Sequence, residues 1–287
     1  MIDFTKYKLS NIRYGGSEKK LGIIIDDNNY MLKFQKNSPF GKRMNHICEY
    51  IGSRIFNYLG FDTQLVFLGL YNNEQVVACK DFVTENVLFV PFNDVGESTI
   101  EDNKELYQYT YEEIITMLNK NKKLTNVKET ISIFWEMYIV DALIGNFDRH
   151  GGNWGFLKEN NKYRLAPIFD NGSSLFPQMI DEDKMKFIME DEEETLKRVY
   201  EFPTSQIKLN NKKSSYYDVI NSLSYKECND ALIKIYKKIN MIDIYKIIDE
   251  VEFLSKIHKE FLKHILNKRY EIIIKASYDK LMENNYE

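Results

Sequence analysis

The strand and helix patterns of this sequence are segregated along the chain, which restricts the folds that it can adopt. Residues 21–35 read as two strands around an Asp/Asn-rich turn, and residues 63–83 read as a second pair of strands around Asn72-Asn73. Between the pairs, residues 42–59 carry isoleucine or leucine at every fourth position, which predicts one helix that ends at Gly60. The first part of the chain is therefore expected to be a small sheet with one inserted helix.

The second part of the chain is predicted to be mainly helical. We expect an α+β fold with a β-rich lobe over residues 1–92 and a larger helical lobe over residues 93–287. A cleft between two such lobes is a common place for a ligand. The elements expected in the second part are helices at 100–119 and 128–146, short strands at 153–158 and 162–167, and helices from 225 to the end.

The composition indicates a globular protein without a strong electrostatic field. The 287 residues are 44% hydrophobic, and 39 basic against 43 acidic side chains give a net charge of −4. Because the basic residues are scattered, no direct contact with nucleic acid is expected. Cys48, Cys79 and Cys228 lie far apart and form no Cys-x-x-Cys pair, so we expect three buried free thiols in a reducing compartment.

The N-terminus carries no apolar signal core, and the chain has no apolar run as long as the roughly 18 residues that a membrane span needs. We therefore expect a soluble protein that is made in the cytoplasm. Export by a route that needs no signal peptide stays open.

A cluster of polar side chains interrupts the hydrophobic pattern at residues 145–153, "GNFDRHGGN". Asp148 and Asn153 lie in a predicted loop between a helix and a strand, and Asp170 follows after a strand pair. Two carboxylates and an amide oxygen that converge suit Mg²⁺, which prefers oxygen ligands. Phosphoryl transfer uses such a set, and the Asp-x-x-x-x-Asn spacing with a later Asp-x-Gly is typical of kinases. The alternative is a purely structural turn in which Arg149 pairs with an acid.

The motifs "GNFDRHGGN" and "LAPIFDNG" resemble the C-terminal part of HipA-like serine/threonine kinases. The resemblance covers most of the chain, with its diagnostic motifs in residues 145–172. It implies a two-lobed kinase-like fold, ATP and Mg²⁺ as cofactors, and a protein hydroxyl as acceptor. It also implies that Asp148 is the catalytic base, that Asn153 and Asp170 bind the metal, and that His150 lies near the transferred phosphate.

The same resemblance sets expectations about partners. Toxin members of the family carry an additional N-terminal segment that this sequence does not show, so a toxin–antitoxin role with a DNA-binding antitoxin is not expected. The resemblance alone suggests a bacterial effector with signal-independent secretion.

A kinase also needs a strand lysine for the α- and β-phosphates and a helix glutamate that holds it. Lys33 alternates with apolar residues on the second predicted strand, and Glu49 begins the following helix, so we predict that these two residues form the pair. Lys80, at the end of the last strand, is the alternative phosphate lysine. A solvent-facing lysine and an ordinary helix acid are the structural alternatives.

Two further segments of the first lobe are predicted to contact ATP. Gly15 and Gly16 would let backbone amides approach the phosphates, with the hydroxyl of Ser17 beside them, although a plain turn explains the same residues. By resemblance, Ser17 is also a candidate for autophosphorylation. "VVACKDFV" resembles the HipA-like hinge, in which Lys80 and Phe82 would offer backbone groups to adenine; an ordinary edge strand is the alternative.

Two other functions share these motifs. Phosphoinositide-type lipid kinases also use Asp-Arg-His-x-x-Asn followed by Asp-x-Gly, but the acidic run at 181–195 would be repelled by an anionic bilayer. A non-catalytic nucleotide-binding module would be expected to lack a catalytic carboxylate or the strand lysine, and neither is missing. We therefore predict an ATP- and Mg²⁺-dependent protein serine/threonine kinase, with autophosphorylation as a further expectation.

Overall fold

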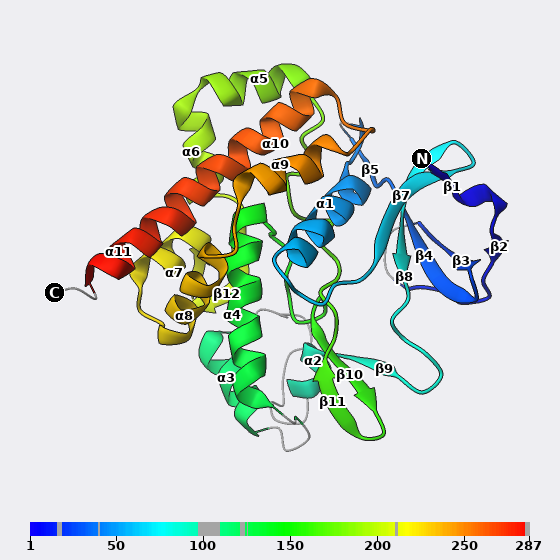
Figure 1. Ribbon diagram of the computed structural model, residues 1–287, viewed down its shortest axis with the longest axis horizontal. Helices are drawn as coiled ribbons and strands as arrows, with labels where there is room; N and C mark the ends of the chain where they lie inside the picture. The colour runs from blue at the N-terminus through cyan, green and yellow to red at the C-terminus, as the bar shows by residue number, and fades with distance from the viewer. Residues whose placement is uncertain are drawn as a thin grey trace.

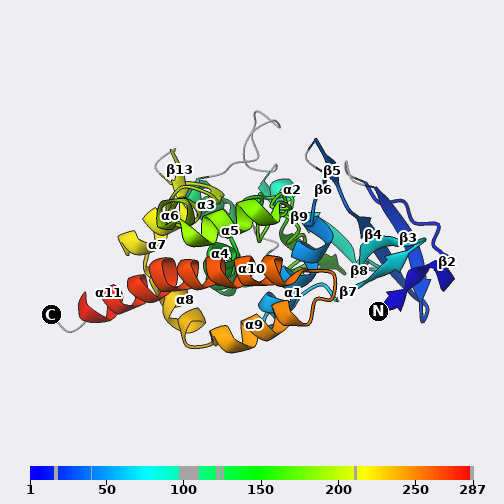
Figure 2. The ribbon, with the colours of Figure 1, turned by 90° about the horizontal axis from the view of Figure 1, so that it is seen from above.

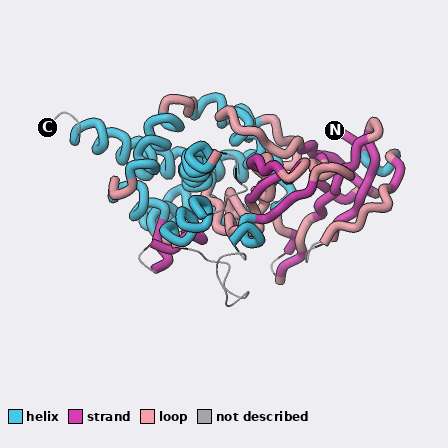
Figure 3. Tube along the Cα trace, turned by 90° about the horizontal axis from the view of Figure 1, so that it is seen from below, coloured by secondary structure: helices cyan, strands magenta, loops and turns pink. Residues whose placement is uncertain are grey.

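The structure is a computed structural model that describes residues 1–15, 19–39, 41–96, 110–120, 124, 126–209 and 212–284. Most strands gather at one end of the molecule and most helices at the other (Figure 3). This arrangement confirms the predicted α+β, two-lobed architecture. A boundary between the lobes at residue 92 stays a prediction.

The first lobe is built on a six-stranded sheet with the strand order β1-β7-β8-β4-β3-β2. Its neighbouring strands are antiparallel except for β1 and β7, which are parallel. A short 3-10 helix, Phe4–Lys6, joins β1 to β2, and a small hairpin is formed by β5 (Asn37–Ser38) and β6 (Gly41–Lys42). The strands of the main sheet are β1 (Ile2–Asp3), β2 (Lys8–Leu9), β3 (Lys20–Ile25), β4 (Asn28–Phe34), β7 (Val66–Tyr71) and β8 (Glu74–Lys80).

Three hairpins turn on pairs of Asp or Asn residues whose φ angles are all positive, between 46° and 65°. A two-residue turn with positive φ at both positions matches the twist of the flanking strands, and Asp and Asn tolerate that conformation. The pairs are Asp26-Asp27, Asn72-Asn73 and Asn160-Asn161, so the predicted turns are confirmed.

Helix α1 (Asn45–Tyr58) connects the two lobes. Its buried isoleucines, Ile47, Ile51 and Ile55, repeat every four residues along one face. The helix contacts β7 and β8 on one side and α9 of the second lobe on the other (Figure 1). Side chains on α1 can therefore reach groups from both lobes.

The second lobe is organised around α4 (Val127–Ile144), whose side chains from Phe134 to Ile144 are all buried. Figure 2 shows α10 and α11 running along this lobe and away from the sheet. A second sheet has the order β11-β10-β9. Its strand β9 comes from the segment after β8, and β10 and β11 form the hairpin after α4 (Figure 1). The remaining elements are β9 (Leu88–Pro91), α2 (Phe92–Gly96), α3 (Tyr111–Lys120), β10 (Gly155–Glu159), β11 (Lys162–Leu165), α5 (Glu182–Glu190), α6 (Glu192–Tyr200), β12 (Thr204–Leu209), β13 (Lys212–Ser215), α7 (Tyr216–Ser222), α8 (Lys226–Tyr236), α9 (Met241–Asp249), α10 (Lys256–Arg269), a π-helical turn (Tyr270–Lys275) and α11 (Ala276–Asn284).

Several expectations can be compared with these elements. Most of the acidic run at 181–195 lies on the solvent-facing side of α5 and α6, with Met185 and Ile188 buried on the other side. The three cysteines are buried and free, as predicted. The start of the helix expected at 100–119 lies outside the described residues. Among the described helices, none is long and apolar enough to cross a membrane.

Candidate active site

Lys33 and Glu49 form a buried ion pair between the sheet and α1. Lys33 lies on β4, and its Nζ donates to Glu49 Oε2 at 2.7 Å and to Asp170 Oδ1 at 3.0 Å. Burial lowers the pKa of Lys33, but Asp170 and Glu49 outweigh it and hold that pKa well above its usual value. The lysine is therefore a fixed positive charge that joins the two lobes.

The loop after α4 is folded by its own asparagines. Gly145 ends the helix in the left-handed conformation, with φ 64°, and its N–H donates to the Asp141 carbonyl. The side chain of Asn146 accepts from the N–H of Asp148 at 3.0 Å, and Asn153 Nδ2 donates to the Asp148 carbonyl at 2.8 Å. These contacts hold the backbone of Asp148 from both sides and leave its carboxylate uncommitted.

The carboxylate of Asp148 is partly exposed. Its side chain is 44% exposed, and Oδ1 lies 4.0 Å from His150 Nε2. Partial burial raises the pKa of Asp148, the neighbouring His150 lowers it, and the charge of Asp170 raises it, with an upward shift as the result. A raised pKa makes a carboxylate a better proton acceptor, which suits a general base.

Arg149 is buried and ties the loop to its surroundings. Its guanidinium donates to both carboxylate oxygens of the buried Asp141, at 2.9 and 3.1 Å. It also donates to the Phe169 carbonyl at 2.5 Å, to the Asn153 carbonyl at 3.1 Å and to Asn171 Oδ1 at 2.5 Å. The pairing of Arg149 with an acid, which belonged to the structural alternative, is present, and the other contacts of Arg149 link residues 149–153 to residues 169–171.

The segment that carries Asp170 is fixed against α1. The N–H of Asn171 donates to Glu49 Oε1 at 2.9 Å, and Asn171 Nδ2 donates to Ser53 Oγ at 2.9 Å. A Cβ at Gly52 would lie 2.7 Å from Asn171 Cβ, so only glycine allows this close approach. Glu49 therefore holds both Lys33 and the segment that carries Asp170.

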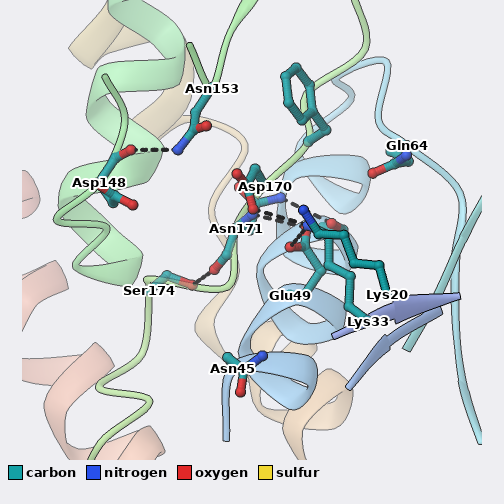
Figure 4. Close-up of polar contacts among 12 residues, drawn as sticks. Lys20, Lys33, Asn45, Glu49, Gln64, Asp148, Asn153, Asp170, Asn171 and Ser174 are labelled. Carbon is teal, nitrogen blue, oxygen red and sulfur yellow. Dashed lines mark hydrogen bonds and ion pairs between the residues drawn. The ribbon is translucent and has the colours of Figure 1, made fainter. Parts of the chain in front are cut away.

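Asp170 is ionised beside Lys33. The Lys33 ammonium lowers the pKa of this carboxyl more strongly than burial raises it. Its backbone has φ 57°, a left-handed conformation that Asp and Asn adopt more readily than other non-glycine residues. In Figure 4, Asp170 lies between the Lys33–Glu49 pair and the Asp148–Asn153 pair. The structure thus brings Asp148, Asn153 and Asp170 to one place, with Lys33 beside them.

Of the predicted phosphate loop, only Gly15 belongs to the described residues; Gly16 and Ser17 lie outside them. Lys20 Nζ donates to the Gly15 carbonyl at 2.6 Å. Lys20 stands opposite Lys33 in the β3–β4 register and lies next to it in Figure 4. Lys20 was not predicted from the sequence, although two lysines on facing strands of one predicted hairpin were a usable signal.

The two predicted hinge residues, Lys80 and Phe82, differ in whether their backbone groups are already hydrogen-bonded. The N–H of Lys80 donates to the Leu65 carbonyl at 2.8 Å, and its carbonyl accepts from Gln64 Nε2 at 2.9 Å. The backbone groups of Phe82 make no hydrogen bond among the described residues. Lys80 is therefore a weaker candidate for binding adenine than the sequence suggested, because its N–H is already paired.

Three aromatic rings pack together at the hinge. The ring centroids of Phe82, Phe89 and Phe169 are 5.1 to 5.9 Å apart. Phe169 directly precedes Asp170, so this cluster joins the hinge to the segment that carries the carboxylate. It supplies an apolar surface beside the backbone of Phe82, which is unpaired among the described residues.

The donor set favours a metal that shares its coordination with phosphate. Within the described ranges, no group of three or more His, Cys, Asp or Glu side chains could hold a metal ion. One carboxylate with one amide oxygen is instead the kind of partial set that Mg²⁺ uses when substrate phosphates and water supply the remaining ligands. Because Asn153 Nδ2 donates to the Asp148 carbonyl, its Oδ1 stays available as a ligand.

Comparisons with known proteins agree with this geometry. Over 291 aligned residues, the chain is 38% identical to the serine/threonine-protein kinase CtkA of Helicobacter pylori (strain J99 / ATCC 700824), covering 98% of this chain and 89% of the relative. The crystal structure of the H. pylori proinflammatory kinase CtkA superimposes with a TM-score of 0.91 at 36% identity, over 98% of both chains.

A more distant likeness concerns the fold alone. HipA from the Shewanella oneidensis MR-1 toxin–antitoxin system, solved with HipB and operator DNA, gives a TM-score of 0.58 at 13% identity over 96% of this chain and 68% of that chain.

The HipA-like C-terminal domain matches residues 12–232, which is most of the chain and includes all the site residues described above. The chain therefore belongs to the HipA-like C-terminal domain family.

Proposed function

We propose that this HipA-like serine/threonine kinase transfers the γ-phosphate of ATP to a serine or threonine hydroxyl of a protein, with Mg²⁺ as the metal. The observation that carries the proposal is the convergence of Lys33, Asp148, Asn153 and Asp170 from both lobes on one cleft. A strand lysine, a general base and two oxygen ligands for a metal are the parts that phosphoryl transfer requires.

The roles follow from the contacts of each side chain. Lys33, held by Glu49, would neutralise the α- and β-phosphates, and Lys20 would add a second positive charge beside the loop at Gly15. Asn153 and Asp170 would hold Mg²⁺, which would supply positive charge to neutralise the phosphates.

Asp148 would orient the acceptor hydroxyl and take its proton, because its carboxylate is exposed and its pKa is raised. His150 lies beside this carboxylate and would face the transferred phosphate. Adenine would pack against the cluster of Phe82, Phe89 and Phe169 and bond to the backbone of Phe82.

Labelled ATP tests this function. With Mg²⁺ and a generic protein substrate, we expect the label on serine or threonine, identified by phosphoamino-acid analysis. Phosphoinositide vesicles offered in parallel should stay unlabelled. Label in the lipid alone would favour the lipid kinase, and binding of ATP without transfer to any acceptor would favour a non-catalytic module.

A further inference from the structure

A cavity of about 670 Å³ adjoins the catalytic loop and has no role in the function proposed above. Phe147 lines it, and the next residue is Asp148, whose Cα lies about 3.8 Å away along the chain. The other walls come from the segment after Asp170, residues 176–181, and from α6 and its C-terminal end. Its volume lies within the ~300–1,000 Å³ that is typical of ligand pockets.

The interior of this cavity is apolar. Phe147, Phe176 and Phe202 lie close together, with ring centroids 5.4 Å apart for Phe147 and Phe202 and 6.4 Å apart for Phe176 and Phe202. Met179 and Ile180 extend the same lining. Phe202 is 48% exposed, so a large aromatic face is available to an incoming group. When a bound group covers such a surface, the burial contributes roughly 25 cal/mol of favourable free energy for each Å² of apolar area removed from water.

The charges at its rim do not favour an acidic occupant. Lys197 pairs with Glu193 and Glu194, at 3.0 and 2.8 Å. Arg198 pairs with Glu194 at 3.0 Å and donates to the Glu194 carbonyl. The whole lining is balanced, because it holds three acids (Asp181, Glu194 and Glu201) and three bases (Lys184, Lys197 and Arg198). The occupant that fits best is therefore an uncharged, apolar side chain.

We propose that this cavity is the acceptor subsite that takes a large apolar side chain of the protein substrate, within a few residues of the phosphorylated serine or threonine. The inference rests on the proposed function, because it requires a protein hydroxyl at Asp148. An extended peptide advances about 3.3–3.6 Å per residue. When the serine or threonine hydroxyl of the peptide lies at Asp148, the residues that flank it in the peptide can therefore reach the cavity beside Phe147.

The test uses a library of peptides that carry one serine among alanine and glycine, with each flanking position varied in turn. We expect the wild type to prefer Phe, Leu or Met over Ala by about tenfold at one flanking position, which is the low end of what an apolar pocket discriminates. Phe202→Ala should reduce that preference to about threefold or less, because it removes one wall of the cavity. Met179→Ala is a second variant for the case in which Phe202→Ala unfolds.

Phe187→Ala is the matched control, because this phenylalanine is 55% exposed on α5 and does not line the cavity. It should keep the wild-type preference. Phosphorylation without any apolar preference, or a preference that Phe202→Ala leaves intact, would overturn the subsite and leave the kinase function standing. Failure of the wild type to label any serine or threonine, in peptides and proteins alike, would remove both.

Discussion

Asp148→Asn is expected to lower the rate of phosphate transfer by about 10²–10⁴-fold, the range usually attributed to a positioned acid or base. The substitution keeps the shape of the side chain. It also keeps the two contacts that hold the backbone of Asp148, because Asn146 and Asn153 bond to its N–H and carbonyl. The loss should therefore fall on proton transfer and leave the folding of the loop intact.

Two readouts separate this explanation from a structural one. Thermal shift with ATP and Mg²⁺ should remain as in the wild type, since Lys33, Asn153 and Asp170 are unchanged. Asp183→Asn, at a side chain on α5 that is 92% exposed, is the matched control and should keep full activity. Wild-type transfer by Asp148→Asn would exclude Asp148 as the base.

Arg149→Met is expected to lower the free energy of unfolding by about 3–5 kcal/mol, because it leaves the buried carboxylate of Asp141 without its partner. The same change removes the hydrogen bonds that join residues 149–153 to the carbonyl of Phe169 and the side chain of Asn171. Activity should fall with stability, since Asp148 and Asp170 lose their common support. Chemical denaturation followed by circular dichroism measures the first effect.

A second substitution tests the physical reason. Asp141→Asn in the Arg149→Met background removes the unpaired buried charge, so it should recover part of the lost stability. Arg164→Met, at an exposed position on β11, is the matched control and should change stability by no more than about 0.5 kcal/mol. No recovery in the double variant would mean that the buried charge is not the cause.

Local patterns were sufficient to predict the elements that support the site. Alternation on β4 placed Lys33 among apolar neighbours, and the four-residue spacing on α1 placed Glu49 on a helix that follows. Their pairing was predictable because the two residues are only 16 positions apart. The turns were also predictable from local sequence, because each turn depends on the φ angles of its own Asp or Asn residues.

Long-range polar contacts were not predictable from such patterns. The bond from Asn171 to Glu49 joins residues 122 positions apart, and no local period records it. The N–H of Lys80 is likewise paired with the carbonyl of Leu65, in a segment that precedes it by 15 positions. This pairing makes Lys80 a weaker candidate for the hinge contact that the sequence alone suggested. Strands of two residues, such as β1 and β2, are too short to show any alternation.

The central claim is that Asp170 and Asn153 would hold one Mg²⁺ at the phosphates of ATP, while Asp148 would take the proton of the acceptor hydroxyl that attacks the γ-phosphate. The most direct test is the rate of phosphate transfer from labelled ATP to protein serine or threonine, measured against Mg²⁺ concentration for the wild type, Asp170→Asn and Asp183→Asn. We expect transfer by the wild type and Asp183→Asn only with Mg²⁺, and a fall of about 10²-fold or more in folded Asp170→Asn, as for the loss of a transition-state charge clamp. Wild-type transfer by folded Asp170→Asn at the same Mg²⁺ concentration would contradict the account.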